Sequence, residues 1–251
     1  MTPANSSHQG SKLMLYLRST ALFIAIFMVT SCIALAMLMS ALLPFEGQYK
    51  LAKMWANYIL FLTKSICGLD YKISGLENLP QKGVAIVLCK HQSAWETIAL
   101  MGLLPKQSVL LKKSLLWIPF WGWAMATLKP IAIDRSAPKE ALSQLLKQGA
   151  LRLQEGFWVV MYPEGTRTAP GEERKFSASG SLLAQRTKVT VIPIAHNAGE
   201  FWPRNSFVKY PGVIQLKIGA PIAVEGRKSK DINAEAETWI KNTMLEIEAT
   251  K

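Results

Sequence analysis

Residues 84–104 read VAIVLCKHQSAWETIALMGLL. The stretch begins with a short apolar run at 84–88, continues through a polar segment that includes His91, and ends in a second, longer apolar run at 97–104. A buried strand that leads through a short turn into a helix has this pattern. We therefore expect a strand, a turn and a helix here, in the order found in α/β proteins.

Short β-rich runs alternate with helical stretches over the rest of the C-terminal part of the chain. The runs lie at 71–74, 109–111, 131–133, 157–161, 189–194 and 213–218, and the clearest helices lie at 139–155 and 232–248. This alternation predicts an α/β fold with a mixed central sheet flanked by helices. No repeat or long linker interrupts the pattern, so we expect residues 70–251 to form one domain.

The composition restricts the class of protein and the kind of partner. Half of the 251 residues are apolar and 18% are charged, and the mean hydropathy is slightly positive, which excludes a disordered chain. The formal charge of +12 favours an anionic partner, such as nucleic acid, an anionic membrane surface or a phosphorylated substrate. Cys32, Cys67 and Cys89 have neither metal-ligand spacing nor an even number, so we expect no disulfide framework and no metal site.

The N-terminal part contains a long uncharged apolar segment. Residues 21–43 carry no charge, and at about 1.5 Å per residue they would form a helix of roughly 34 Å, enough to cross a hydrocarbon core of about 30 Å. A membrane-spanning anchor is the preferred interpretation. Two alternatives are a helix that lies in one leaflet and a cleaved signal peptide that ends near Cys32, although apolar residues continue past that cysteine.

The segment that follows predicts a second membrane contact and an orientation. Residues 49–69 form a basic amphipathic pattern, which either contacts the membrane surface or docks on the globular domain. The lysines after the apolar segment outnumber Lys12 and Arg18 before it, which favours a cytoplasmic C-terminal domain at the inner membrane. We thus expect residues 1–69 to be a membrane-associated two-helix segment.

The first candidate site is His91 with Glu96, at the junction between the expected strand and helix. A turn there would let the carboxylate fold back onto one ring nitrogen and leave the other nitrogen free as a general base. The alternative is structural, because Ser93 and Glu96 also match a capping box that would only fix the start of the helix.

The second candidate site, YPEGTR at 162–167, directly follows the run at 157–161. Pro163 and Gly165 favour a turn at a strand end, where sheet proteins place ligands. Thr166 and Arg167 then offer a hydroxyl and a planar cation that suit an oxyanion such as phosphate. The alternative is an ordinary surface turn.

Together these motifs resemble those of the glycerophospholipid acyltransferases, and within them the bacterial 1-acyl-sn-glycerol-3-phosphate acyltransferases. Four blocks match in order over roughly residues 70–225. They are His91 with Glu96; Lys112-Lys113 with Pro119, Gly122 and 131–135; Pro163 to Arg167; and Ile192-Pro193-Ile194. Glu96 departs from the pattern, because the family usually has Asp at this position.

The resemblance implies a transferase of phospholipid biosynthesis that moves a fatty acyl group from a thioester to the sn-2 hydroxyl of a lysophosphatidate. It implies catalytic roles for His91 as base, Glu96 as its partner and Lys112 as the oxyanion cation, with Lys113 as the alternative. It places the phosphate on Arg167 with Thr166, or on Arg135, and assigns Gly165 and Glu164 to the same binding loop, where Glu164 would mainly brace it.

No cofactor and no metal are expected from the resemblance. The expected partners are the lysolipid, acyl-CoA or acyl carrier protein as the acyl donor, and an anionic membrane surface, without nucleic acid. A sister acyltransferase for another lysolipid and a non-catalytic basic lipid-binding protein are the alternatives. An esterase would need an activated nucleophile, and no serine or cysteine lies in a nucleophile-elbow context.

Overall fold

A seven-stranded mixed sheet forms the centre of the protein in a computed structural model that describes residues 12–40, 44–134 and 136–249. The strands are β1 (Leu69–Ser74), β2 (Ile86–Cys89), β3 (Gln107–Lys112), β4 (Ile131–Ile133), β5 (Trp158–Met161), β6 (Val191–His196) and β7 (Gly212–Ile218). They are ordered β1-β7-β6-β2-β5-β3-β4, and the only antiparallel pair among them is β6 with β7. The predicted mixed α/β sheet is confirmed.

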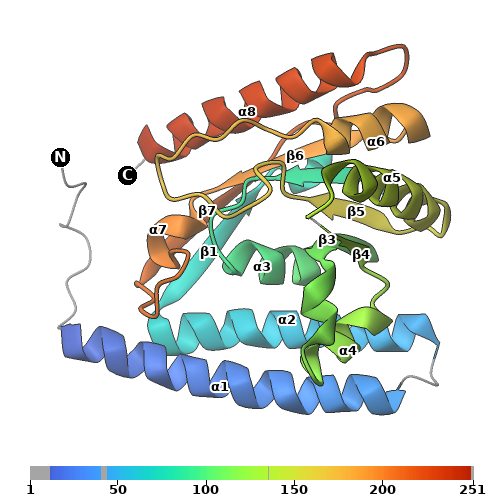
Figure 1. Cartoon of the computed structure of the whole chain (residues 1–251). Helices are drawn as coiled ribbons and strands as arrows, with labels where there is room; N and C mark the ends of the chain where they lie inside the picture. The colour runs from blue at the N-terminus through green and yellow to red at the C-terminus, as the bar shows by residue number, and fades with distance from the viewer. Residues whose placement is uncertain (1–11, 41–43, 135, 250–251) are drawn as a thin grey trace.

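Helices cover both faces of this sheet (Figure 1). One face carries α5 (Pro138–Gln154), α6 (Ser179–Thr187) and α8 (Ser229–Ala249). The other carries α3 (Trp95–Leu103), with α1 (Lys12–Met39) and α2 (Phe45–Cys67) beyond it. The shorter helices are η2 (Leu76–Asn78), η3 (Lys113–Trp117), α4 (Trp121–Thr127) and α7 (Ala198–Phe201). Strands β2, β5 and β6 are buried throughout, as expected of strands covered on both faces.

The two-helix segment predicted for residues 1–69 is present, and α1 lies along the domain. Lys209 N donates to Ser19 Oγ at 2.9 Å, and Trp55 Nε1 of α2 donates to Thr30 Oγ1 at 3.0 Å. The contacts of α1 with α2 and α4 extend this attachment (Figure 1). By length and composition α1 could cross a membrane, and these contacts hold it alongside the rest of the protein. Residues 41–43 of the expected span lie outside the described residues.

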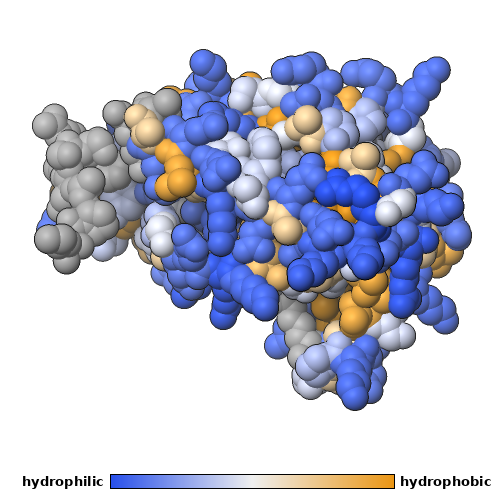
Figure 2. Space-filling model, turned by 90° about the horizontal axis from the view of Figure 1, so that it is seen from above, coloured by the Kyte–Doolittle hydropathy of each residue, from blue (hydrophilic) through white to orange (hydrophobic). Residues whose placement is uncertain are grey.

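The side of the molecule formed by α1, α2 and the α4 region exposes many apolar side chains. The opposite side, above α8, is largely hydrophilic (Figure 2). Large apolar side chains are exposed on α1, α2 and the region around α4: Leu13, Leu17, Phe23, Ile24, Phe27, Met28, Met54, Tyr58, Phe61, Trp117, Phe120 and Trp123. A contiguous apolar face of this kind is typical of a surface that contacts a membrane or another protein.

Candidate active site

The candidate residues meet at one edge of the sheet because β2, β3, β5 and β6 run parallel. His91 follows β2, Lys112 ends β3, the 162–167 loop follows β5, and His196 ends β6. The carboxyl ends of parallel strands are the usual place for ligands in α/β sheets. The two motifs that are separate in the sequence are therefore neighbours in space.

His91 and Glu96 form a short contact, with Nδ1 of the ring 2.7 Å from Oε1 of the carboxylate. The same carboxylate accepts from Gln92 N at 3.1 Å, and its two oxygens accept from Ser93 N at 3.1 and 3.0 Å. Glu96 thus accepts hydrogen bonds from the backbone just before α3 and also orients the histidine. The contacts of the helix-capping interpretation and those of the histidine-partner interpretation are both made by this one side chain.

The carboxylate fixes the tautomer of the neutral His91 ring. Because Nδ1 faces an acceptor, it carries the proton, and Nε2 keeps its lone pair. Complete burial would raise the pKa of Glu96, but the electrostatic interactions with His196 and His91 and the hydrogen bonds from His91 and Ser93 outweigh it, so the pKa lies below its ordinary value. The Tyr162 ring stacks on His91 with 4.2 Å between ring centroids and supports its plane.

His196 is a neighbour of the His91–Glu96 pair that the sequence analysis did not select as a site residue. It is fully buried, and its Nδ1 accepts from Ala198 N at 3.1 Å, so the proton is on Nε2. Nε2 donates to Lys90 O at 2.8 Å and lies 3.8 Å from Glu96 Oε2. Burial lowers the pKa of His196, and the ring stays neutral. The only sequence signal was its place just after the fourth block.

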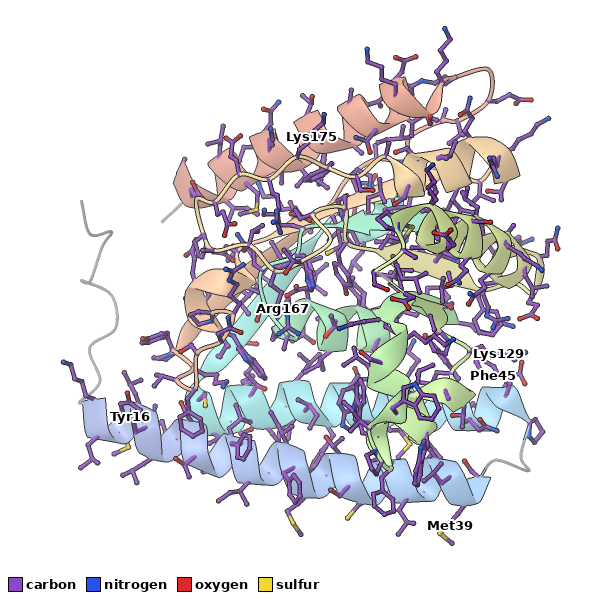
Figure 3. All side chains as sticks on the ribbon, in the orientation of Figure 1. Tyr16, Met39, Phe45, Lys129, Arg167 and Lys175 are labelled. Atoms are coloured by element: carbon purple, nitrogen blue, oxygen red, sulfur yellow. The ribbon has the colours of Figure 1, made fainter. Side chains whose placement is uncertain are left out.

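The 162–167 turn separates its side chains into two groups. Gly165 has a φ of +71°, which favours glycine, and lies exposed beside Thr166. Arg167 lies near α3 (Figure 3), and Arg204 Nη1 donates to its carbonyl oxygen. Glu164 is turned inward instead, where its carboxylate contacts Lys90 Nζ at 2.9 Å.

A cavity of about 770 Å³ begins at these polar groups. Its polar lining includes His91, Lys112, Gly165 and Arg167. Most of the remaining wall is apolar and comes from β3, α4, α5 and α6: Val109, Leu111, Trp121, Met125, Ala141, Leu142, Leu145 and Leu182. Such a pocket suits a ligand with a polar head and a long apolar chain.

Only some of the predicted site residues line this cavity. Those that line it are His91, Lys112, Gly165 and Arg167, whereas Glu96 and Glu164 lie behind it and Thr166 lies on the exposed turn. Arg135 lies outside the described residues. Among the residues the structure describes, no group of three His, Cys, Asp or Glu side chains is placed to hold a metal ion.

Comparison with known proteins gives one consistent result. The Acyltransferase family model matches residues 70–197. The chain is 46% identical to the 1-acyl-sn-glycerol-3-phosphate acyltransferase of Pseudomonas aeruginosa, over 85% of this chain and 84% of the relative. It is 31% identical to the protein of the same name from Saccharomyces cerevisiae, over 88% and 74% of the two chains.

A solved structure shares the fold. The crystal structure of the 1-acyl-sn-glycerophosphate (LPA) acyltransferase from Thermotoga maritima superimposes with a TM-score of 0.74. The match covers 94% of this chain and 96% of the other at 23% identity, so it includes the N-terminal helices as well as the sheet.

Proposed function

Because this chain belongs to the Acyltransferase family, we propose that it transfers a fatty acyl group from a thioester to the sn-2 hydroxyl of 1-acyl-sn-glycerol 3-phosphate. The product is phosphatidic acid. The observation that carries the proposal is the His91–Glu96 pair, whose histidine lines a largely apolar cavity together with Arg167 and Lys112. A base, two cations and an apolar channel are the four requirements of this reaction.

His91 Nε2 takes the proton of the acceptor hydroxyl as its oxygen attacks the thioester carbonyl. Glu96 stabilises the imidazolium that forms, through the 2.7 Å contact with Nδ1. A tetrahedral oxyanion results, and Lys112 provides the positive charge beside it. When the intermediate collapses, the carbon–sulfur bond breaks and the thiolate takes the proton from His91. No acyl-enzyme forms, and the residues return to their starting state.

Arg167 binds the phosphate of the acceptor, since its guanidinium can form two parallel hydrogen bonds to an oxyanion. The exposed Thr166 hydroxyl and the Gly165 backbone complete the turn, with Arg135 as a second cation. Glu164 acts through the loop rather than on the substrate, because its carboxylate faces Lys90. The donor chain occupies the apolar part of the cavity.

The N-terminal helices hold this site at the lipid surface. We propose that the exposed apolar side chains of α1, α2 and the α4 region lie in one leaflet of the inner membrane, with the sheet domain in the cytoplasm. Both the acceptor and the product are membrane lipids. A site held at the interface therefore lets them enter and leave the enzyme without passing through water. The donor, acyl-CoA or acyl carrier protein, approaches from the cytoplasm.

The test is an acceptor panel with purified protein in detergent or vesicles and both classes of donor. We expect release of free thiol from the donor that depends on lysophosphatidate, and formation of phosphatidic acid. The same assay with lysophosphatidylcholine, lysophosphatidylethanolamine and an amino-acid lysolipid tests the sister-enzyme alternative. Turnover with one of these and none with lysophosphatidate would refute the proposed acceptor, and thiol release with no acceptor at all would indicate an esterase.

A further inference from the structure

Lys90 precedes the proposed base in the sequence, and its side chain is buried, with 10% of its surface exposed. Nζ lies 2.9 Å from Glu164 Oε1 and donates to Thr168 Oγ1 at 2.9 Å. Glu164 and Thr168 immediately flank the tripeptide 165–167, which carries Arg167. One ammonium group on the His91 segment therefore holds both ends of the proposed phosphate-binding turn.

The backbone of His91 is tied to the same two residues. Thr168 donates to His91 O from its backbone nitrogen at 2.8 Å and from its hydroxyl at 3.0 Å. His91 N donates to Glu164 Oε1 at 3.4 Å. On the other side, His196 Nε2 fixes the Lys90 carbonyl at 2.8 Å. The base and the turn thus form one hydrogen-bonded unit with Lys90 at its centre.

Stability alone gives a weak reason for this arrangement. A buried ion pair loses the hydration of both charges, and well-packed apolar side chains of similar volume often replace such a pair without loss of stability. The second carboxylate oxygen, Glu164 Oε2, accepts no hydrogen bond within the described residues although it is buried. The pair is better explained by the geometry that it imposes than by the energy that it contributes.

We propose that Lys90 is a positioning residue that fixes the distance between His91 and Arg167, and so sets the acceptor hydroxyl against the base while its phosphate is bound. The inference rests on the proposed function, which supplies the two ends of the substrate. A misplacement of about 1 Å between reacting groups can cost about 100-fold in rate. Loss of the clamp should therefore affect both acceptor binding and turnover.

The experiment is a double-mutant cycle with Lys90→Met, Glu164→Met and the double variant, measured for Tm, kcat and acceptor KM. Each single variant leaves a buried charge without its partner and should lower the Tm, whereas the double variant removes both charges and should recover it. We expect each variant, including the double, to lose about 10- to 100-fold in kcat/KM for the acceptor. The losses should not multiply, because either change breaks the same clamp.

The matched control is the same pair of exchanges at Lys217 and Glu246, an ion pair of 3.0 Å between β7 and α8. These variants should keep wild-type kinetics. If the Lys90→Met/Glu164→Met protein regains both its Tm and its kcat/KM, the pair is only structural and the proposal is wrong. If the losses of the single variants multiply, or Lys90→Met has wild-type kinetics, Glu164 acts independently of Lys90 and the proposal is equally wrong.

A readout without substrate separates this inference from the proposed function. The Thr168 amide donates to His91 O, so hydrogen exchange at Thr168 should be slow in wild type and at least about ten-fold faster in the double variant. Wild-type protein that does not acylate lysophosphatidate would refute the proposed acceptor, while the exchange experiment would still test the clamp. Unchanged exchange in the double variant would overturn the clamp, whatever the acceptor.

Discussion

Glu96→Gln tests the proposed mechanism most directly. Glu96 Oε1 accepts hydrogen bonds from His91 Nδ1, Gln92 N and Ser93 N. In the glutamine variant we expect the amide oxygen to occupy the position of Oε1, because only the oxygen can accept these bonds. The substitution then keeps the ring orientation but removes the charge that stabilises the imidazolium. Hydrogen bonds to charged groups contribute about 1.5–3 kcal/mol, which corresponds to a fall in kcat of about 10- to 150-fold.

The same geometry predicts a measurable loss of stability. The glutamine NH₂ would replace Oε2, which accepts from Ser93 N at 3.0 Å and lies 3.8 Å from His196 Nε2. Two donors would then face the new NH₂ group. An unsatisfied buried donor costs about 1–3 kcal/mol. For a protein of this size the Tm should fall by about 2–12 °C, at about 2–4 °C per kcal/mol.

The assay is thiol release from the acyl donor at saturating lysophosphatidate, performed well below the Tm of the variant. Glu96→Asp is the matched control, since it restores the charge but shortens the reach, and we expect intermediate kcat. Wild-type kcat in folded Glu96→Gln protein would refute the reasoning. Glu96 would then only fix the start of α3, and His91 would act without a carboxylate partner.

His91→Ala should lower kcat by about 10²–10⁴-fold with little change in Tm, and near-wild-type turnover by the purified variant would remove His91 as the base. Arg167→Ala should chiefly raise the acceptor KM, and Arg167→Lys should recover only part of the loss because a point charge lacks the bidentate fork. An unchanged KM would place the phosphate elsewhere, first at Arg135. Wild-type stability should fall as the pH drops below about 6.5, because the unfolded chain protonates His196 more readily than the folded protein, whose ring has a lowered pKa. His196→Gln should flatten the part of the Tm–pH curve just below about pH 6.5, and an unaltered slope would assign the acid sensitivity to another group.

The sequence by itself determined the element types and the order of the motifs. Strands β2 and β5 were predicted closely because strands buried on both faces read as continuous apolar runs. The helix expected at 139–155 is α5 (Pro138–Gln154), which Pro138 begins and Gly156 follows. The His91–Glu96 contact was also predictable, because a five-residue separation across a strand-to-helix turn is local geometry.

Only the tertiary structure decided how these parts meet. Hydropathy predicts an apolar helix near the N-terminus but not its bounds or its direction. The helix is α1 (Lys12–Met39), and its direction depends on the contacts of Ser19 with Lys209 and of Thr30 with Trp55. Lys90 carried no signal in the sequence, and His196 carried only its place after the fourth block, because the partners of both residues are distant in sequence. The strand order β6-β2-β5 brings Lys90 and His196 close to each other and brings Lys90 close to Glu164. Because these groups are buried, water does not replace a lost partner, so each interaction depends on the groups beside it.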